Sequence, residues 1–125
     1  MNKPRVLFVD DEKGLVSAVV TRLKMRDIEA HGVTSSLDAL RKLEDEKFDV
    51  VVLDVRMPDI GGLDVLRRFR DKYPNLQVVL MSGHGSIENK EEGERLGAFA
   101  YLQKPVEIED LVDVIHRAAS ASGRR

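Results

Sequence analysis

The sequence predicts an α/β fold built on a doubly wound, five-stranded parallel sheet. Three short runs are apolar and rich in β-branched residues: 6–9 (VLFV), 50–53 (VVVL) and 78–81 (VVLM). Strands that are apolar on both faces are typical of the middle of a parallel sheet covered by helices on both sides. Amphipathic stretches alternate with these runs, and that alternation is typical of consecutive βα units.

Two weaker strands and five helices complete the expected fold. The weaker strands are expected near residues 28–32 and 100–102, and the fourth helix at about 86–96. For five strands the usual order is 2-1-3-4-5, as in flavodoxin-like folds. The other four helices are expected where apolar residues recur at helical spacing: Leu15, Val16, Val19, Val20 and Leu23; Leu37, Leu40 and Leu43; Leu63, Leu66 and Phe69; Ile108, Leu111, Val112, Ile115 and Ala119.

Length and composition indicate one globular domain. The chain has 125 residues, of which 42% are hydrophobic and 34% charged. We expect a core over about residues 5–119 and a frayed tail over 120–125. The net charge of −2 gives no argument for binding nucleic acid or an anionic membrane. The sequence has no cysteine, its first apolar run is too short for the apolar region of a signal peptide, and no stretch is long enough for a membrane span, so we expect a cytoplasmic protein without disulfides.

Polar residues follow four of the five expected strands. Asp10 and Asp11 follow the first strand, Asp54 the third, Ser82 the fourth and Lys104 the fifth. Taken alone, each of these residues can have a purely structural role, because Asp often caps a helix and Ser-Gly and Lys-Pro are common in loops. The carboxyl ends of parallel strands meet at one edge of the sheet, and ligands bind there. The conjunction therefore predicts a functional site at that edge.

The chemistry of this cluster favours phosphoryl transfer with a metal ion. Three neighbouring carboxylates repel one another, and a hard divalent cation such as Mg²⁺ removes that repulsion. Asp54 would be the nucleophile, while Ser82 and Lys104 would contact phosphoryl oxygens, since this reaction needs mostly positioning and charge neutralisation. The three histidines are scattered and are expected not to be ligands: His31, His84 and His116.

Four segments resemble a known family. VLFVDDE, VVLDVRMPDIGGLDVL, VLMSGHG and GAFAYLQKP are similar, in order and spacing, to the signature segments of response-regulator receiver domains, especially those of nitrogen-regulation-type regulators. The resemblance covers about residues 5–119. It implies a phosphorylation switch rather than a turnover enzyme, with a sensor histidine kinase or a phosphotransfer protein as phosphodonor. It also implies output to a downstream protein, or through a homodimer, by the face of the fourth helix, fifth strand and fifth helix.

The resemblance also implies a role for each site residue. Asp54 matches the phosphoacceptor. Asp11 matches the carboxylate that contacts Mg²⁺ directly, and Asp10 its partner acting through water. Arg56 matches the residue that offers Mg²⁺ its backbone carbonyl.

Four further positions match the switch elements of the family. Ser82 matches the switch hydroxyl and Lys104 the family's lysine. Tyr101 matches the aromatic residue that turns inward on phosphorylation, although an ordinary half-buried strand tyrosine is the alternative. Pro105 matches a proline preceded by a cis bond. Gly61 stands where the family often has Asp or Asn, but glycine is also an acceptable helix N-cap.

Two other classes of protein remain open at this point. A haloacid-dehalogenase-like phosphohydrolase also uses an Asp nucleophile and Mg²⁺, but its D-x-D pattern differs from the adjacent Asp10–Asp11 pair. A phosphorylation-independent docking module would be favoured if Asp54, Ser82 or Lys104 were missing, and all three are present.

The fourth helix is expected to be unusually weak. Ile87 and Leu96 are its only large apolar residues, and Gly93 costs about 1 kcal/mol relative to alanine inside a helix. Its glutamates also repel one another at helical spacing. We expect a helix that is shortened, displaced or mobile, unless neighbouring residues repack around it.

Overall fold

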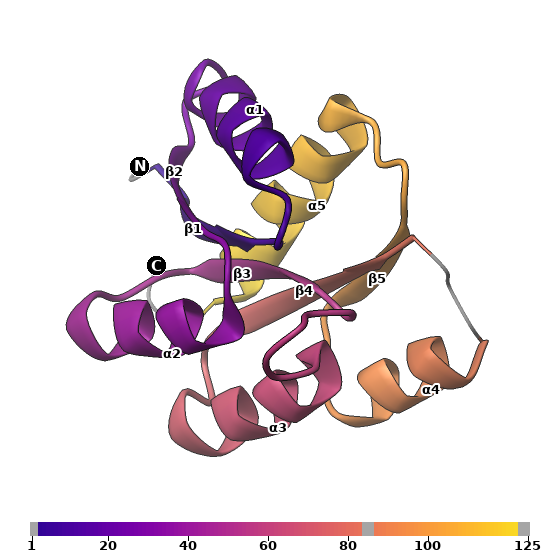
Figure 1. The fold of residues 1–125 in the computed structure, drawn as a ribbon. Helices are drawn as coiled ribbons and strands as arrows, with labels where there is room; N and C mark the ends of the chain where they lie inside the picture. Colours follow the sequence, from indigo (N-terminus) through magenta and orange to yellow (C-terminus); the bar gives the residue numbers. More distant parts are fainter. Residues whose placement is uncertain (1–2, 84–86, 123–125) are drawn as a thin grey trace.

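The expected sheet is present in the computed structural model, which describes residues 3–83 and 87–122. Five parallel strands are hydrogen-bonded in the order β2-β1-β3-β4-β5 (Figure 1). This confirms the predicted fold class. The strands are β1 (Arg5–Val9), β2 (Glu29–Val33), β3 (Val50–Asp54), β4 (Gln77–Ser82) and β5 (Ala100–Gln103).

Helices cover both faces of the sheet. The core on one face includes residues of α1 and α5, and the core on the other includes residues of α2 and α3, with α4 on that same side (Figure 1). The alternation along β1 shows the division, because Val6 and Phe8 face α1 and α5 whereas Leu7 and Val9 face the other layer. No helix in the described ranges is long and apolar enough to cross a membrane. The helices are α1 (Lys13–Lys24), α2 (Ser36–Asp45), α3 (Gly62–Lys72), α4 (Ile87–Arg95) and α5 (Ile108–Ala121).

The last helix extends further than expected. The sequence predicts a frayed tail from residue 120. In the structure, Ser120 and Ala121 lie within α5, and Ser122 is its buried C-cap. The Ser122 amide donates to the Ala119 carbonyl (3.1 Å), and the Ser120 hydroxyl donates to that of His116 (3.0 Å). These hydrogen bonds satisfy groups that a fraying end would leave to water.

Both ends of the described chain lie at the amino edge of the sheet, where the strands begin (Figure 1). The Pro4 carbonyl, just before β1, accepts from the Glu29 amide (2.9 Å). The end of α5 reaches the start of β4, since the Gln77 side-chain amide donates to the Ala121 carbonyl (3.4 Å). The carboxyl ends of the strands are therefore at the opposite edge.

The fourth helix forms, and a glycine explains how it packs. The observed α4 is slightly shorter than the predicted 86–96, whose first residue is outside the described ranges. Gly93 is buried, and a Cβ built on it would lie 2.6 Å from Leu80 Cδ1 of β4. Glu92 beside it pairs with Arg67 of α3 (3.3 Å). The glycine that lowers helix propensity thus allows α4 to lie close to the sheet, and the low stability of α4 stays a prediction.

We expect Gly93→Ala to destabilise the protein. Alanine gains about 1 kcal/mol in helix propensity, but overpacking against Leu80 costs about 1–3 kcal/mol. Urea denaturation should therefore show a net loss of about 1 kcal/mol. Gly14→Ala in α1 is the matched control, because a Cβ there meets nothing within 4 Å. That control should be neutral or stabilising, and a stabilising Gly93→Ala would contradict the packing argument.

Candidate functional site

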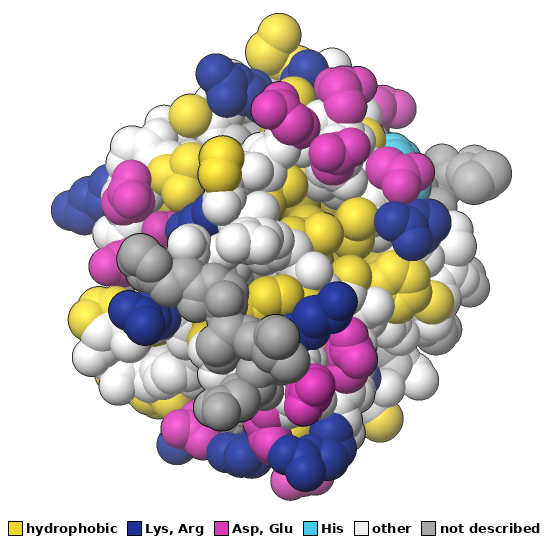
Figure 2. All heavy atoms as spheres, turned by 90° about the vertical axis from the view of Figure 1, so that its right-hand side faces the viewer, with side chains coloured by type: hydrophobic (Ala, Val, Ile, Leu, Met, Phe, Trp, Pro, Cys, Tyr) yellow, Lys and Arg dark blue, Asp and Glu magenta, His cyan; other side chains and the backbone are white. Residues whose placement is uncertain are grey.

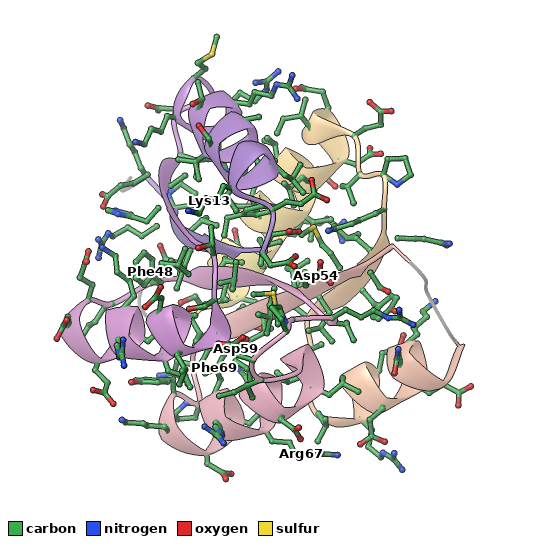
Figure 3. All side chains as sticks on the ribbon, in the orientation of Figure 1. Lys13, Phe48, Asp54, Asp59, Arg67 and Phe69 are labelled. Atoms are coloured by element: carbon green, nitrogen blue, oxygen red, sulfur yellow. The ribbon has the colours of Figure 1, made fainter. Side chains whose placement is uncertain are left out.

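The residues predicted to form a site do lie together at the carboxyl edge of the sheet. The Lys104 ammonium donates to Asp10 Oδ2 (2.5 Å) and to Asp54 Oδ2 (2.9 Å), and it thereby joins residues that follow or end β1, β3 and β5. Asp10 is fully buried and Asp54 is 7% exposed. Figure 3 labels Asp54 at the end of its strand. Two buried carboxylates thus share one internal cation.

The second oxygen of each buried carboxylate accepts a backbone amide. Asp10 Oδ1 accepts from the Glu12 amide (3.0 Å) and Asp54 Oδ1 from the Arg56 amide (2.9 Å). Both donors lie two residues after the aspartate, in the loop that follows its strand. These bonds fix the orientation of each carboxylate and leave acceptor capacity on every oxygen, because an ionised carboxylate has about four lone-pair sites.

The environment of Lys104 keeps it charged. Burial lowers the pKa of Lys104. The hydrogen bonds to Asp10 and Asp54 and the negative charges of these two residues raise it by more, so the pKa of Lys104 lies above its ordinary value of 10.5. Its backbone is also fixed, because the Lys104 amide donates to the Ser82 carbonyl at 2.8 Å. The ammonium is therefore a permanent positive charge at neutral pH.

Asp11 completes a set of carboxylates that fits a small cation. Oxygens of Asp10, Asp11 and Asp54 lie within 4.8 Å of one another. In an octahedral Mg²⁺ site the ligands lie about 2.0–2.1 Å from the ion, so adjacent ligands are about 2.9 Å apart and opposite ligands about 4.2 Å apart. Oxygens within 4.8 Å of one another are near enough to share one such ion, either directly or through a bridging water. Asp11 is exposed, unlike the other two, and can reach an ion from the solvent side.

Ser82, Tyr101 and Pro105 take the positions expected from the strand ends. Ser82 is fully buried at the end of β4. Tyr101 is half-buried in β5 against the α2–α3 side of the core, and its buried hydroxyl has no hydrogen-bond partner in the described chain. The Lys104–Pro105 bond is cis, the isomer expected.

The described histidines lie away from the carboxylate cluster. His31 on β2 contacts Glu29 (3.2 Å) and packs edge-on against Phe48. His116 is exposed on α5. His84 is outside the described residues.

Sequence reasoning missed one residue near the site, Asp59. Its carboxylate accepts from the amides of Ser36 (3.2 Å) and Leu37 (3.0 Å) at the start of α2. Figure 3 labels it between α2 and α3. The dipeptide Pro58–Asp59 predicts a turn, but no sequence spacing indicates that this turn lies beside α2.

A partly apolar groove adjoins the site. A cavity of about 490 Å³ between α1 and the start of α5 is lined by Leu15, Lys104, Val106, Ile108 and Leu111, among others. Figure 2 looks onto the side of the molecule at the right of Figure 1, where apolar side chains lie exposed among acidic and basic ones. The same Lys104 therefore contacts the buried carboxylates and lines a groove open to solvent.

Comparison with known proteins gives a consistent result. The family model described as "Response regulator receiver domain" matches residues 6–116. The chain is 37% identical over 115 residues to the response regulator protein FleR of Pseudomonas aeruginosa, covering 92% of this chain and 24% of that protein. It is 31% identical over 118 residues to the DNA-binding transcriptional regulator NtrC of Proteus hauseri, covering 94% and 25%. The chain thus spans about a quarter of the length of these curated relatives.

Solved structures agree with the sequence comparison. A response regulator receiver domain protein from Clostridium thermocellum matches with a TM-score of 0.89 at 32% identity, over 94% of both chains. A beryllofluoride-activated NtrC4 receiver domain dimer matches with a TM-score of 0.88 at 30% identity, over 93% of this chain and 96% of that one. Nothing in these matches supports a haloacid-dehalogenase-like phosphohydrolase.

Proposed function

This chain belongs to the family of response regulator receiver domains, the phosphorylation-activated switches of two-component systems, and we propose that Asp54 is the side chain that accepts its phosphoryl group. The observation that carries the proposal is the position of Asp54. Asp54 ends the central strand β3, accepts a hydrogen bond from Lys104 and lies in the same carboxylate cluster as Asp10 and Asp11.

The residues around Asp54 can supply what phosphoryl transfer needs. A carboxylate oxygen of Asp54 attacks phosphorus, the bond from phosphorus to the donor nitrogen breaks, and its electron pair returns to the donor imidazole. Lys104 neutralises negative charge on the transferred group, and Ser82 donates to one of its oxygens. Mg²⁺, held by Asp10, Asp11, Asp54 and the Arg56 carbonyl, would supply the remaining positive charge.

The conformational change on phosphorylation is proposed to pass from the site to the surface through Ser82 and Tyr101. Ser82 ends β4 and Tyr101 lies on the neighbouring strand β5, where it pairs in register with Leu80. The Tyr101 hydroxyl lacks a partner in the described chain, and an unpaired buried hydroxyl is costly. A change at Ser82 could therefore shift Tyr101 readily between inward and outward positions.

The proposed partners are a histidine kinase or phosphotransfer protein as donor and a protein as receiver of the signal. The groove beside Lys104 offers apolar surface next to the phosphorylation site, where a donor must approach. The face of α4, β5 and α5 is proposed for output, either to a downstream protein or to a second copy. A cytoplasmic location and the absence of catalytic turnover belong to the same proposal.

Incubation with acetyl phosphate tests the assignment of Asp54. Wild-type protein with Mg²⁺ should gain the mass of one phosphoryl group, and both removal of Mg²⁺ with EDTA and the substitution Asp54→Ala should prevent the gain. Asp71→Ala removes an exposed carboxylate at the far end of α3 and should behave as wild type. A gain that persists in Asp54→Ala would refute the assignment, and repeated turnover of a phosphomonoester would favour an enzyme.

A further inference from the structure

The start of α2 is capped by another element of the fold. The Ser35 hydroxyl accepts from the amide of Asp38 (3.0 Å), a local cap within the same segment. The two amides before it, those of Ser36 and Leu37, instead donate to the two oxygens of Asp59. Since the first amides of a helix have no intrahelical acceptor, Asp59 supplies what α2 itself lacks.

A third hydrogen bond runs between the same two segments. Ser36 is fully buried, and its hydroxyl donates to the Ile60 carbonyl at 2.7 Å. The loop from residue 55 to 61 is thus joined to α2 by three hydrogen bonds, two accepted by Asp59 and one by Ile60. A negative charge at the positive end of the helix dipole adds a favourable interaction.

The ionisation of Asp59 agrees with this contact. Burial raises its pKa, but the amides of Leu37, Ile60 and Ser36 lower it more, so that the pKa of Asp59 lies below its ordinary value of 3.8. The carboxylate is therefore charged at neutral pH and interacts with α2 in that form.

The loop held in this way begins at the phosphorylation site. Its base is fixed by Asp54, whose Oδ1 accepts from the Arg56 amide, and by the Val55 carbonyl, which accepts from the Gly62 amide (2.8 Å). A Cβ on Gly62 would lie 2.7 Å from the Asp54 carbonyl oxygen, so the two ends of the loop touch. Between them Arg56, Pro58 and Asp59 are exposed, and only Val55 and Met57 are buried apolar anchors.

We propose that Asp59 is a positioning residue for phosphorylation, because its bonds to α2 hold the loop that presents the Arg56 backbone to the site. This inference rests on the proposed function of Asp54 and extends it to a residue on the outer side of the loop. Asp59 touches neither the phosphoryl group nor the metal ion. Its effect passes through the backbone from residue 59 to residue 56.

The chain offers a matched control for this role. Ser35→Ala removes a cap from the same end of α2 but has no bond to the loop. Both Asp59→Ala and Ser35→Ala should lower the urea midpoint, and Asp59→Ala should lower it more, because it removes two hydrogen bonds and a favourable charge. Ser36→Ala removes the third bond and is a second probe of the connection. Asp59→Asn keeps an acceptor oxygen without the charge and should recover part of the wild-type behaviour.

Two measurements separate positioning from stability. In Mg²⁺-free protein, the amides of residues 56, 57, 59 and 60 should exchange faster in Asp59→Ala than in Ser35→Ala. In an NMR titration with Mg²⁺, Asp59→Ala should bind about tenfold more weakly than wild type, as is typical when support for a metal ligand is lost. Ser35→Ala should stay within about twofold of wild type. Phosphorylation by acetyl phosphate at subsaturating Mg²⁺ should follow the same order.

The outcomes distinguish this inference from the function on which it rests. If Asp59→Ala and Ser35→Ala match in amide exchange and Mg²⁺ affinity, Asp59 is only a cap and the inference is wrong, while Asp54 can still be phosphorylated. If wild type gains no phosphoryl group at Asp54, the proposed function fails. Amide exchange in the metal-free protein still decides whether Asp59 orders the loop.

Discussion

In Mg²⁺-free solution, Lys104→Ala is expected to lower the free energy of unfolding by about 3 kcal/mol, since a buried carboxylate that loses its only cation is strongly destabilising. Asp10 and Asp54 both contact the Lys104 ammonium, and the Asp10 side chain is only 1% exposed. Without the ammonium, two carboxylates face each other in a poorly solvated site. Urea denaturation in the presence of EDTA measures the loss.

Mg²⁺ should restore much of that stability. The formal charges of the three aspartates and Lys104 add up to −2, and those of the three aspartates alone in the variant add up to −3. A bound divalent cation replaces the missing positive charge and stabilises the folded state by about 2.7 kcal/mol at a concentration 100 times its dissociation constant. Lys42→Ala is the control, because the Lys42–Glu46 pair (2.7 Å) is partly exposed and should contribute less than about 1 kcal/mol.

The dependence on pH has a definite sign. Because the folded pKa of Lys104 is raised, its contribution is complete below the ordinary value of 10.5 and is lost only as pH rises through the higher folded value. The difference between wild type and Lys104→Ala should therefore be constant through neutral and mildly basic solution. A difference that disappears below pH 9, or that ignores Mg²⁺, would contradict the proposed role of the ammonium.

Asp11→Ala is expected to weaken Mg²⁺ binding about 100-fold, and Asp10→Ala about tenfold. Asp10 is fully buried, and its two oxygens face Lys104 and the Glu12 amide rather than the solvent. Asp11 is exposed, and within the described chain its carboxylate accepts no hydrogen bond, so it can coordinate an ion directly. NMR titration with Mg²⁺ gives both affinities.

The two variants should also differ in stability without metal. Asp11→Ala removes one member of a repulsive cluster and should be neutral or slightly stabilising. Asp10→Ala removes a buried partner of Lys104 and should destabilise the protein, without unfolding it. Asp71→Ala again serves as the control for a lost negative charge. Equal Mg²⁺ affinity in wild type and Asp11→Ala would remove Asp11 from the proposed ligands.

The sequence predicted the architecture because the pattern of the central strands leaves little choice. The runs around Leu7, Val51 and Val79 are apolar at every position, and only a sheet covered on both faces buries such strands. The order of the strands then followed from the usual topology of five βα units. Tertiary contacts changed only details, such as the longer α5 and the close packing of Gly93 on Leu80.

The sequence predicted which residues gather at the site, but it did not predict the hydrogen bonds between them. Strand ends place Asp10, Asp54 and Lys104 at one edge, but no sequence rule says that Lys104 bonds both carboxylates. Asp59 was missed for a different reason. Its partners lie 23 and 22 residues earlier in the chain, and capping rules consider only residues next to the helix. Contacts between a loop and a distant helix end require the folded structure.

The position of the chain ends makes the domain suitable as a fluorescent sensor. Both described ends lie at the amino edge of the sheet (Figure 1), whereas Asp54 ends β3 and Lys104 follows β5, at the carboxyl edge. A reporter protein fused at either end, or a tether to a solid surface, would therefore leave the approach to Asp54 open. An environment-sensitive dye could then be placed beside Tyr101, where conformational changes on phosphorylation are proposed. Signals from such a dye would report the phosphorylated fraction in real time without a downstream partner.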